Sequence, residues 1–370
     1  MWIHENNNWP DFSWENEKVL PVLVRVRHLQ GRLLGRMEGL GFSLKQEASL
    51  NTLTRDVVTS SAIEGEKLSA EEVRSSIARR LGIEIAGLLI PASRDVEGIV
   101  EIMLDATQKH EKLTDERLFG WHSALFPAGR SGMHRIIVGA WRTEATGAMQ
   151  VVSGAVGRET VHFEAPQATR LEKEMTAFLH WFEDESPIDP VIKAGIAHFW
   201  FITIHPFEDG NGRIARAIAD MALSRADGIC ERFYSMSAQI EKERKIYYSE
   251  LEKQQRNSTD ITDWLIWFLE CLERAIDSAR ETTGNVIEKA KFWEHFQNVS
   301  LNERQRKMVN RLLDGFQGNI NTSRYARMTK CSNDTALRDL RALLNLGILI
   351  KNAGAGRSTS YSLIAIEDLL

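Results

Sequence analysis

Cysteine is scarce in this chain. Only Cys230, Cys271 and Cys331 occur among 370 residues, and no two of them form a Cys-x-x-Cys pair. A sparse and odd cysteine count argues against a disulfide framework and favours a reducing compartment. We therefore expect a cytoplasmic protein.

Long apolar runs are missing as well. No stretch of 18 apolar residues occurs, so we expect no membrane-spanning segment and no membrane partner. The first residues, MWIHENNNWPDF, are polar and contain no apolar core of a signal peptide. Internal repeats and low-complexity tracts are not found either, which excludes repeat architectures and disordered linkers of that kind.

The remaining composition is that of a globular protein, with 43% hydrophobic and 26% charged residues. The length allows two or three domains with a substantial core. The net charge of -5 is unevenly distributed. Residues 301–370 contain eleven Lys or Arg and six Asp or Glu, a net +5, so the rest of the chain carries -10. A basic C-terminal part on an acidic body indicates an anionic partner for that part alone.

Apolar residues recur at helical spacing through much of the chain, for example over residues 17–38 and 45–60, which predicts a mainly α fold. Residues 138–163 differ, because β-branched residues and glycines alternate there. We predict a β-hairpin, which is either a substrate-facing flap or a structural cover. Residues 187–204 are apolar on nearly every side and predict the buried centre of a domain, with His198 as a core residue.

One stretch, HPFEDGNGRIAR at residues 205–216, concentrates polar chemistry where one helix ends and another begins. The backbone N–H groups of Gly210, Asn211 and Gly212 lie at a helix N-terminus and form a cradle for an anion. Arg213 and Arg216 are three residues apart, so they share a helix face and suit phosphate oxygens. The segment predicts a phosphate site.

Two further residues of the stretch supply acid–base and metal chemistry. Asp209 is a hard oxygen ligand beside the cradle, suited to a Mg²⁺ ion that bridges phosphates. His205 lies across the loop, and its ordinary pKa near 6.5 lets it accept a proton from a hydroxyl at neutral pH. Each feature alone is weak, and only their combination is specific.

HPFEDGNGRIAR resembles the signature of the Fic (filamentation induced by cAMP) family, HPFx(D/E)GNGRxxR, at every defined position. Residues 60–65, SSAIEG, resemble the family's inhibitory motif, (S/T)xxxE(G/N), in the subclass that carries it N-terminal to the core. The resemblance implies a Fic-type helical core in which residues 138–163 form a target-positioning flap. It also implies a small domain at 1–50 and a core at 51–275 with its inhibitory helix near 50–66. Residues 276–300 are charged and predict a helical connector.

The resemblance also implies an activity, the transfer of AMP from ATP to a Ser, Thr or Tyr hydroxyl of a protein, or of the enzyme itself, with release of pyrophosphate. His205 would deprotonate the hydroxyl, Phe207 would lock the loop, and Asp209 would hold Mg²⁺ on the α- and β-phosphates. The residues implied to bind ATP through its phosphates are Gly210, Asn211, Gly212, Arg213 and Arg216.

In the family the inhibitory Glu, here Glu64 with Ser60 in the same motif, pairs with the second motif arginine, here Arg216. We therefore expect an autoinhibited enzyme. Tyr248 is implied to lie near the adenine, although an ordinary amphipathic helix is the alternative for residues 237–255. Removal of AMP, or transfer of another phosphate-containing group, stays open at the same site, and a homodimer is a further expectation.

Residues 301–370 resemble a winged helix-turn-helix. Helical segments at 302–313, 322–330 and 333–346 precede two alternating apolar segments, and 333–346 would be the recognition helix. The residues that could contact DNA phosphates are Arg338, Arg341, Lys351 and Arg357. Because Asp334 and Asp339 lie on the same helix, dimerisation or target docking is an equal alternative. A DNA-binding regulator with a nucleotide-sensing core is therefore the competing function.

Overall fold

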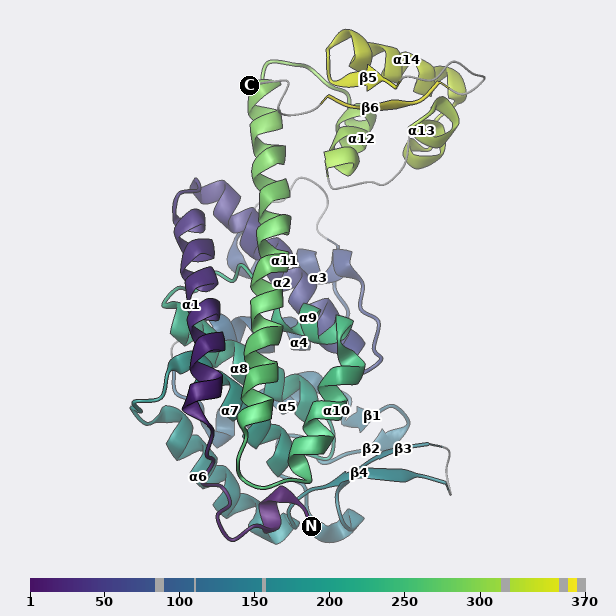
Figure 1. Ribbon diagram of the computed structural model, residues 1–370. Helices are drawn as coiled ribbons and strands as arrows, with labels where there is room; N and C mark the ends of the chain where they lie inside the picture. Colours follow the sequence, from purple (N-terminus) through teal and green to yellow (C-terminus); the bar gives the residue numbers. More distant parts are fainter. Residues whose placement is uncertain (84–89, 110, 155–157, 314–319, 353–358, 365–370) are drawn as a thin grey trace. The chain divides into compact units, whose positions relative to one another are not determined.

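The computed structural model describes the chain except residues 84–89, 110, 155–157, 314–319, 353–358 and 365–370 (Figure 1). Contacts divide it into two compact units, Met1–Ala279 and Arg280–Leu370. The fold is mainly helical with small two-stranded antiparallel sheets, as the periodicity predicted. No helix in the described part of the chain is long and apolar enough to cross a membrane.

The first unit is a bundle of helices around α7 (Pro190–Ile204) and α8 (Asn211–Asp227). Every residue of α7 from Ala194 to Ile204 is buried, as its uniform apolarity predicted. His198 is one of them, and its Nε2 lies 3.0 Å from the Tyr247 hydroxyl, so it is a core residue. The helices around this pair are α1 (Asn16–Glu38), α2 (Phe42–Ile63), α3 (Ala70–Leu81), α4 (Arg94–Gln108), α5 (Asp115–Leu125), α6 (Leu171–Glu183), α9 (Met236–Lys242) and α10 (Arg244–Gln255).

The helix that carries Ser60 begins at Phe42, three residues before the predicted helical segment at 45–60. The inhibitory segment predicted near residues 50–66 is thus the C-terminal part of α2 and the residues that follow it. The end of α2 agrees with the prediction, because Glu64 is the C-cap and Gly65 follows with φ of +88°. A glycine adopts that left-handed conformation without the strain that a side chain would add.

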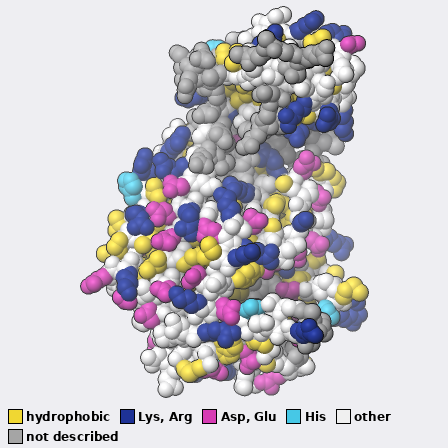
Figure 2. Space-filling view, turned by 45° about the vertical axis from the view of Figure 1, so that its right-hand side comes forward, with side chains coloured by type: hydrophobic (Ala, Val, Ile, Leu, Met, Phe, Trp, Pro, Cys, Tyr) yellow, Lys and Arg dark blue, Asp and Glu magenta, His cyan; other side chains and the backbone are white. Residues whose placement is uncertain are grey.

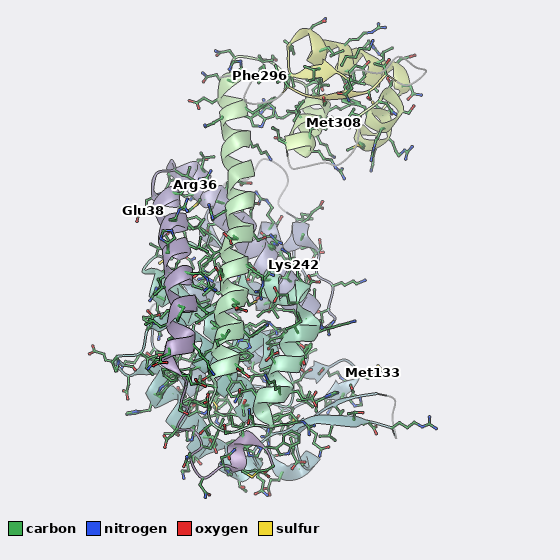
Figure 3. All side chains as sticks on the ribbon, viewed as in Figure 1. Arg36, Glu38, Met133, Lys242, Phe296 and Met308 are labelled. Atoms are coloured by element: carbon green, nitrogen blue, oxygen red, sulfur yellow. The ribbon has the colours of Figure 1, made fainter. Side chains whose placement is uncertain are left out.

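Two short strand pairs lie in the first unit. The predicted hairpin is present as β3 (Gln150–Ser153) and β4 (Thr160–Glu164), with an irregularity between Val151 and Val152. Its strands start about a dozen residues after the predicted start at residue 138. A second pair, β1 (Arg130–Ser131) with β2 (His134–Arg135), was not predicted, because two-residue strands leave no alternating pattern. Met133, in the turn between them, projects away from the body (Figure 3).

The predicted connector at 276–300 is for the most part not a separate helix. Residues 262–295 form one continuous helix, α11, and the boundary between the two units falls within it. The second unit continues with α12 (Glu303–Leu313), α13 (Thr322–Thr329), α14 (Asn333–Asn345), β5 (Leu349–Lys351) and β6 (Tyr361–Leu363). This order of three helices and a strand pair is the predicted one, and its separate core includes Phe296 and Met308 (Figure 3). Arg357 lies outside the described residues.

Candidate active site

The turn between α7 and α8 is held in an unusual backbone conformation. His205 has φ of 52° and ψ of 58°, a left-handed geometry that costs energy for a residue with a side chain. The Asn211 side chain closes the turn, because it accepts a hydrogen bond from the Phe207 N–H (2.9 Å) and donates one to the Phe207 carbonyl (2.8 Å). Phe207 is fully buried and stacks on His122 with ring centroids 4.2 Å apart. The Asn211 amide is thus used within the loop itself.

Arg142 anchors the same turn from the segment that leads into the hairpin. Its side chain donates to the carbonyls of His205 (2.8 Å), Pro166 (2.5 Å) and Ile204 (3.4 Å). Its backbone N–H donates to the Pro206 carbonyl at 2.9 Å. Burial lowers the pKa of Arg142 to about 10, so it stays charged at neutral pH. A cation that binds only carbonyl groups fixes the backbone beside His205.

His205 has the tautomer and charge of a general base. Its Nδ1 lies 3.1 Å from the Ile202 carbonyl, which can only accept, so Nδ1 carries the proton and Nε2 carries the lone pair. Burial, with a smaller contribution from the nearby Arg142, lowers the pKa of His205 to about 4. The ring is therefore neutral at pH 7 and able to accept a proton at Nε2.

The carboxylate of Asp209 is held at the N-terminus of α8. Its Oδ1 accepts the Gly210 N–H at 2.6 Å, its Oδ2 accepts the Ser131 hydroxyl, and its backbone carbonyl lies 3.2 Å from Nε2 of His122. No cluster of three or more His, Cys, Asp or Glu side chains suited to a metal is found among the described residues. A lone carboxylate fits Mg²⁺ that is shared with substrate phosphates, because Mg²⁺ retains water and phosphate ligands.

Arg216 is almost completely buried and faces α2. It donates from Nε to the Ser60 hydroxyl (3.0 Å), and from one terminal nitrogen to the Ser60 carbonyl (2.9 Å) and to Oε1 of Glu64 (2.8 Å). Burial disfavours its charge, but the attraction of Glu64 outweighs this and raises the pKa of Arg216. The predicted pairing of Glu64 with Arg216 is therefore present in the geometry, and Ser60 contacts the same arginine, which was not predicted.

Glu64 also covers the anion cradle. A Cβ added at Gly212 would collide with Oε1 of Glu64, so the carboxylate lies directly against the N-terminus of α8. This is where a helix attracts negative charge. Tyr248 donates from its hydroxyl to Oε2 of Glu64 at 3.3 Å. Tyr248 thus lies beside the inhibitory carboxylate, while its predicted position near an adenine stays a prediction.

Glu66, which the sequence motif did not single out, engages the other arginine. Its Oε2 lies 2.8 Å from Nη1 of Arg213, whose guanidinium also lies 5.1 Å from the Phe126 ring centroid. Among the described residues, Nε of Arg213 and Nη1 of Arg216 are buried without a hydrogen-bond partner. Buried cationic donors of this kind require an acceptor. The two arginines therefore fit a polyanion larger than the two carboxylates that now face them.

Four residues that contact the 205–216 segment were not identified from the sequence, namely Ser131, Arg142, His122 and Glu66. The first three lie 63 or more residues away from the loop that they contact. Only Glu66 had a detectable signal, because it is an acid two positions after Glu64.

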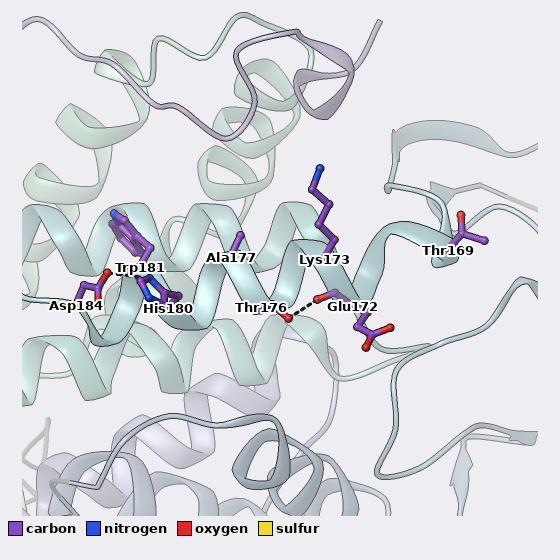
Figure 4. Close-up of a pocket in the computed structure, with 8 residues that line it drawn as sticks. All are labelled: Thr169, Glu172, Lys173, Thr176, Ala177, His180, Trp181 and Asp184. Atoms are coloured by element: carbon purple, nitrogen blue, oxygen red, sulfur yellow. Dashed lines mark hydrogen bonds and ion pairs between the residues drawn. The ribbon is translucent and has the colours of Figure 1, made fainter.

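A hollow of about 860 Å³ lies along α6, away from these residues (Figure 4). All its lining residues come from one stretch, 169–184, so it is a groove on one helix and not a site where several elements converge. Active-site pockets usually bring together polar groups from several elements.

Two parts of the chain match known protein-family models, and one of them contains the 205–216 turn. Residues 112–223 match the Fic/DOC family. This Fic region includes the whole turn, whereas a separate domain of unknown function, DUF4172, matches residues 2–83 and includes Ser60, Glu64 and Glu66.

Curated relatives are distant and longer. The chain is 28% identical over 232 residues to Protein adenylyltransferase Fic of Nematostella vectensis. This alignment covers 60% of this chain and 48% of that protein. It is 29% identical over 167 residues to Protein adenylyltransferase fic-1 of Caenorhabditis elegans, in an alignment that covers 45% of this chain and 30% of that protein. The chain thus spans less than half the length of either relative.

Solved structures share the fold. A Fic family protein from Desulfovibrio desulfuricans aligns with a TM-score of 0.54 at 20% identity, over 94% of this chain and 96% of that one. A Fic domain containing signaling protein from Bacteroides thetaiotaomicron aligns with a TM-score of 0.51 at 19% identity, over 70% of this chain and 97% of that one. The Fic-like helical fold is therefore established over most of the chain.

Proposed function

We propose that this protein is an autoinhibited protein adenylyltransferase that transfers AMP from ATP to a Ser, Thr or Tyr hydroxyl. The observation that carries the proposal is the carboxylate of Glu64 on Arg216 at the N-terminus of α8. A carboxylate there stands in for a phosphate, because it occupies the helix N-terminus and a buried arginine that a phosphate would use. The distant relatives named as adenylyltransferases agree with this choice.

The reaction follows from the side chains around the turn. Nε2 of His205 takes the proton of the acceptor hydroxyl, the hydroxyl oxygen bonds to the α-phosphorus of ATP, and pyrophosphate leaves. Asp209 would hold Mg²⁺, which supplies charge neutralisation on the phosphates. Arg213 and Arg216, once released from their carboxylates, would bind the outer phosphates. The protein contributes mainly positioning and fixed charge, which suits phosphoryl chemistry.

Glu64 would block this arrangement in two ways. It neutralises Arg216, and it occupies the volume next to Gly212 that a phosphate would need. Its side chain is 31% exposed, whereas that of Arg216 is 2% exposed, so Glu64 is the partner that can move away. Activation therefore requires displacement of Glu64 and leaves the arginine in place.

Mass spectrometry of the Glu64→Gly protein, incubated with ATP and Mg²⁺, tests the proposal. We expect a mass increase of one AMP group that disappears in the Glu64→Gly, His205→Ala double variant. If no adduct forms on the protein or on added cell extract, the transferase proposal is wrong. Release of AMP from a previously modified protein by the unchanged chain would instead favour removal of AMP, the alternative reaction at this site.

A second candidate, DNA binding by residues 280–370, is favoured by one observation. Asp339 points into the core of that unit, where it accepts hydrogen bonds from Arg304 (2.9 Å), Asn302 (2.9 Å) and Tyr325 (3.2 Å). It therefore does not lie on the exposed face of α14, whereas Asp334, in the first turn of that helix, is exposed. Figure 2 shows Lys and Arg side chains on the visible face of this unit. Its exposed cations include Arg324, Arg327, Lys330, Arg338 and Arg341.

A DNA-binding measurement on the full chain tests this candidate. Arg338 and Arg341 are three residues apart on α14 and share its exposed face. We expect salt-dependent binding of duplex DNA that weakens in the Arg338→Gln, Arg341→Gln double variant. The Arg306→Gln, Arg311→Gln double variant, which replaces two exposed arginines of α12, provides a control with the same change of charge. Equal weakening by both variants would contradict specific use of α14.

A further inference from the structure

The short hairpin β1–β2 meets the 205–216 turn at two consecutive acids. The backbone N–H of Ile137, which follows β2, donates to Oε2 of Glu208 at 2.8 Å. The Ser131 hydroxyl, on β1, donates to Oδ2 of Asp209. Both sides of this hairpin are thus bonded to the turn, and one of these bonds reaches the carboxylate that fits a metal ion.

Backbone bonds within the hairpin set the position of Ser131. Ser131 pairs with His134, so a two-residue turn that begins at Gly132 joins the strands. Gly132 has φ of 54°, the left-handed conformation that tight hairpin turns require and that glycine adopts without strain. The Ile136 N–H donates to the Gly129 carbonyl at 3.2 Å and closes the base of the hairpin. Ser131 is therefore held in place independently of its bond to Asp209.

Other groups hold the backbone and the second carboxylate oxygen of Asp209. The Gly139 N–H donates to Nδ1 of His122 at 3.2 Å, so Nε2 of that ring carries the proton and donates to the Asp209 carbonyl. The Gly210 N–H donates to Oδ1 of Asp209 at 2.6 Å. With Ser131 on Oδ2, the protein donates one hydrogen bond to each carboxylate oxygen.

This arrangement orients the carboxylate and leaves it able to bind a cation. A carboxylate oxygen can accept at two lone pairs, so each oxygen of Asp209 keeps one beyond its hydrogen bond to the protein. Mg²⁺ requires nearly ideal octahedral geometry, which a freely rotating carboxylate does not supply. Loss of a group that orients a metal ligand typically weakens metal binding about 10- to 100-fold.

We propose that Ser131 is a positioning residue that orients the Asp209 carboxylate for the divalent cation bound with ATP. The inference rests on the proposed function, in which Asp209 holds Mg²⁺. Ser131 acts through Asp209 and takes no part in proton transfer, which belongs to His205. Its bond to Asp209 is present while Glu64 lies on Arg216, so the carboxylate is oriented before the brake is released.

Calorimetric titration with α,β-methylene-ATP tests the proposal without any catalytic turnover. Carbon joins the α- and β-phosphates of this analogue, so AMP cannot be transferred. The full-length Glu64→Gly protein is titrated with the analogue in Mg²⁺ and, separately, in EDTA. In the same background, Ser131→Ala should weaken binding of the Mg²⁺ complex about 10- to 100-fold and leave binding in EDTA unchanged, because only the cation needs the oriented carboxylate.

Three further variants separate orientation from a general structural effect. Ser131→Thr keeps the hydroxyl and should keep the affinity for the Mg²⁺ complex. Ser153→Ala makes the same chemical change on β3, where the hydroxyl lies 2.6 Å from Nε2 of His162 and not on the turn, so neither affinity should change. In an Asp209→Ala background, Ser131→Ala should cause no further loss, since the two residues act as one unit.

The outcomes distinguish this inference from the function on which it rests. Unchanged binding of the Mg²⁺ complex by Ser131→Ala overturns the inference while the proposed function stands. Tighter binding also overturns it, because the hydroxyl would then compete with the cation, and so does an equal loss in Mg²⁺ and in EDTA, which would indicate a distorted turn. If the Glu64→Gly protein binds the analogue in neither condition, the proposed function fails, and the inference fails with it because no cation remains to be bound with ATP.

Discussion

The two acids after α2 should restrain the active site unequally. Glu64 contacts Arg216, whose side chain is 2% exposed, through a hydrogen bond of 2.8 Å, and it also fills the space beside Gly212. Glu66 contacts Arg213 at the same distance, but these two side chains are 47% and 7% exposed, against 31% and 2% for Glu64 and Arg216. Water and salt therefore weaken the second pair more than the first.

These contacts set the expected magnitudes. A hydrogen bond to a buried charged group contributes about 1.5–3 kcal/mol, and ATP must displace that contact before its outer phosphates can bind. Because about 1.4 kcal/mol corresponds to a factor of ten, Glu64→Gly should raise the initial rate of AMP transfer roughly 10- to 100-fold. An exposed pair contributes about 0.2–1 kcal/mol, so Glu66→Gln alone should raise the rate less than about fivefold.

Glu64→Gln separates charge from volume. Glutamine removes the charge but still fills the space next to Gly212, so its rate should lie between those of the unchanged chain and Glu64→Gly. The assay is the initial rate of α-³²P label incorporation into the protein at subsaturating ATP, together with the rise in Tm that ATP causes. Equal activation by Glu66→Gln and Glu64→Gly would refute the argument from burial. Full activation by Glu64→Gln would refute the role of volume.

Three further predictions concern the residues that shape the turn. In a Glu64→Gly background, Arg142→Gln should lower kcat at least about 100-fold but keep the rise in Tm that ATP causes. The substitution displaces the base, His205, and leaves the phosphate cradle in place. Loss of the ATP-induced rise in Tm would contradict this. Gly212→Ala should abolish that rise in Tm even without Glu64, since the added methyl group occupies the cradle, and retained ATP binding would contradict it. Burial lowers the pKa of His122 to about 4 and that of His198 to about 3, both from 6.5. As the pH falls, these histidines take up protons in the unfolded chain before they do so in the folded protein. The free energy of unfolding measured with urea should therefore be highest above about pH 6.5 and should fall towards pH 3. A free energy of unfolding that stays constant from pH 7 to 5 would argue against buried neutral imidazoles.

Several elements of the fold were accessible from local sequence. The uniform apolarity of residues 187–204 predicted a buried helix, and α7 is buried throughout from Ala194. Ser and Thr are typical of helix starts, and the side chains of Ser69 and Thr114 cap α3 and α5. These features depend on neighbours within four residues, so the pattern along the chain contains the information.

Elements with little local signal were missed or misplaced. The pair β1–β2 has two residues per strand, which is too short for an alternating pattern. The continuation of α11 to His295 was not predicted either, because the length of a helix depends on the packing that supports it. Helix boundaries are therefore less predictable than helix existence.

The sequence by itself determined the chemistry of the turn: a base, a lone carboxylate, a glycine-rich helix start and two arginines lie within residues 205–216, and Glu64 is identifiable from its own short motif. Only the tertiary structure decided which groups meet these residues. It brings Glu64 onto Arg216 across 152 positions, Arg142 onto His205 across 63, and His162 onto Glu252 across 90. The physical reason is that backbone geometry is governed by adjacent residues, whereas pairs so far apart in the chain meet only where separate elements pack together.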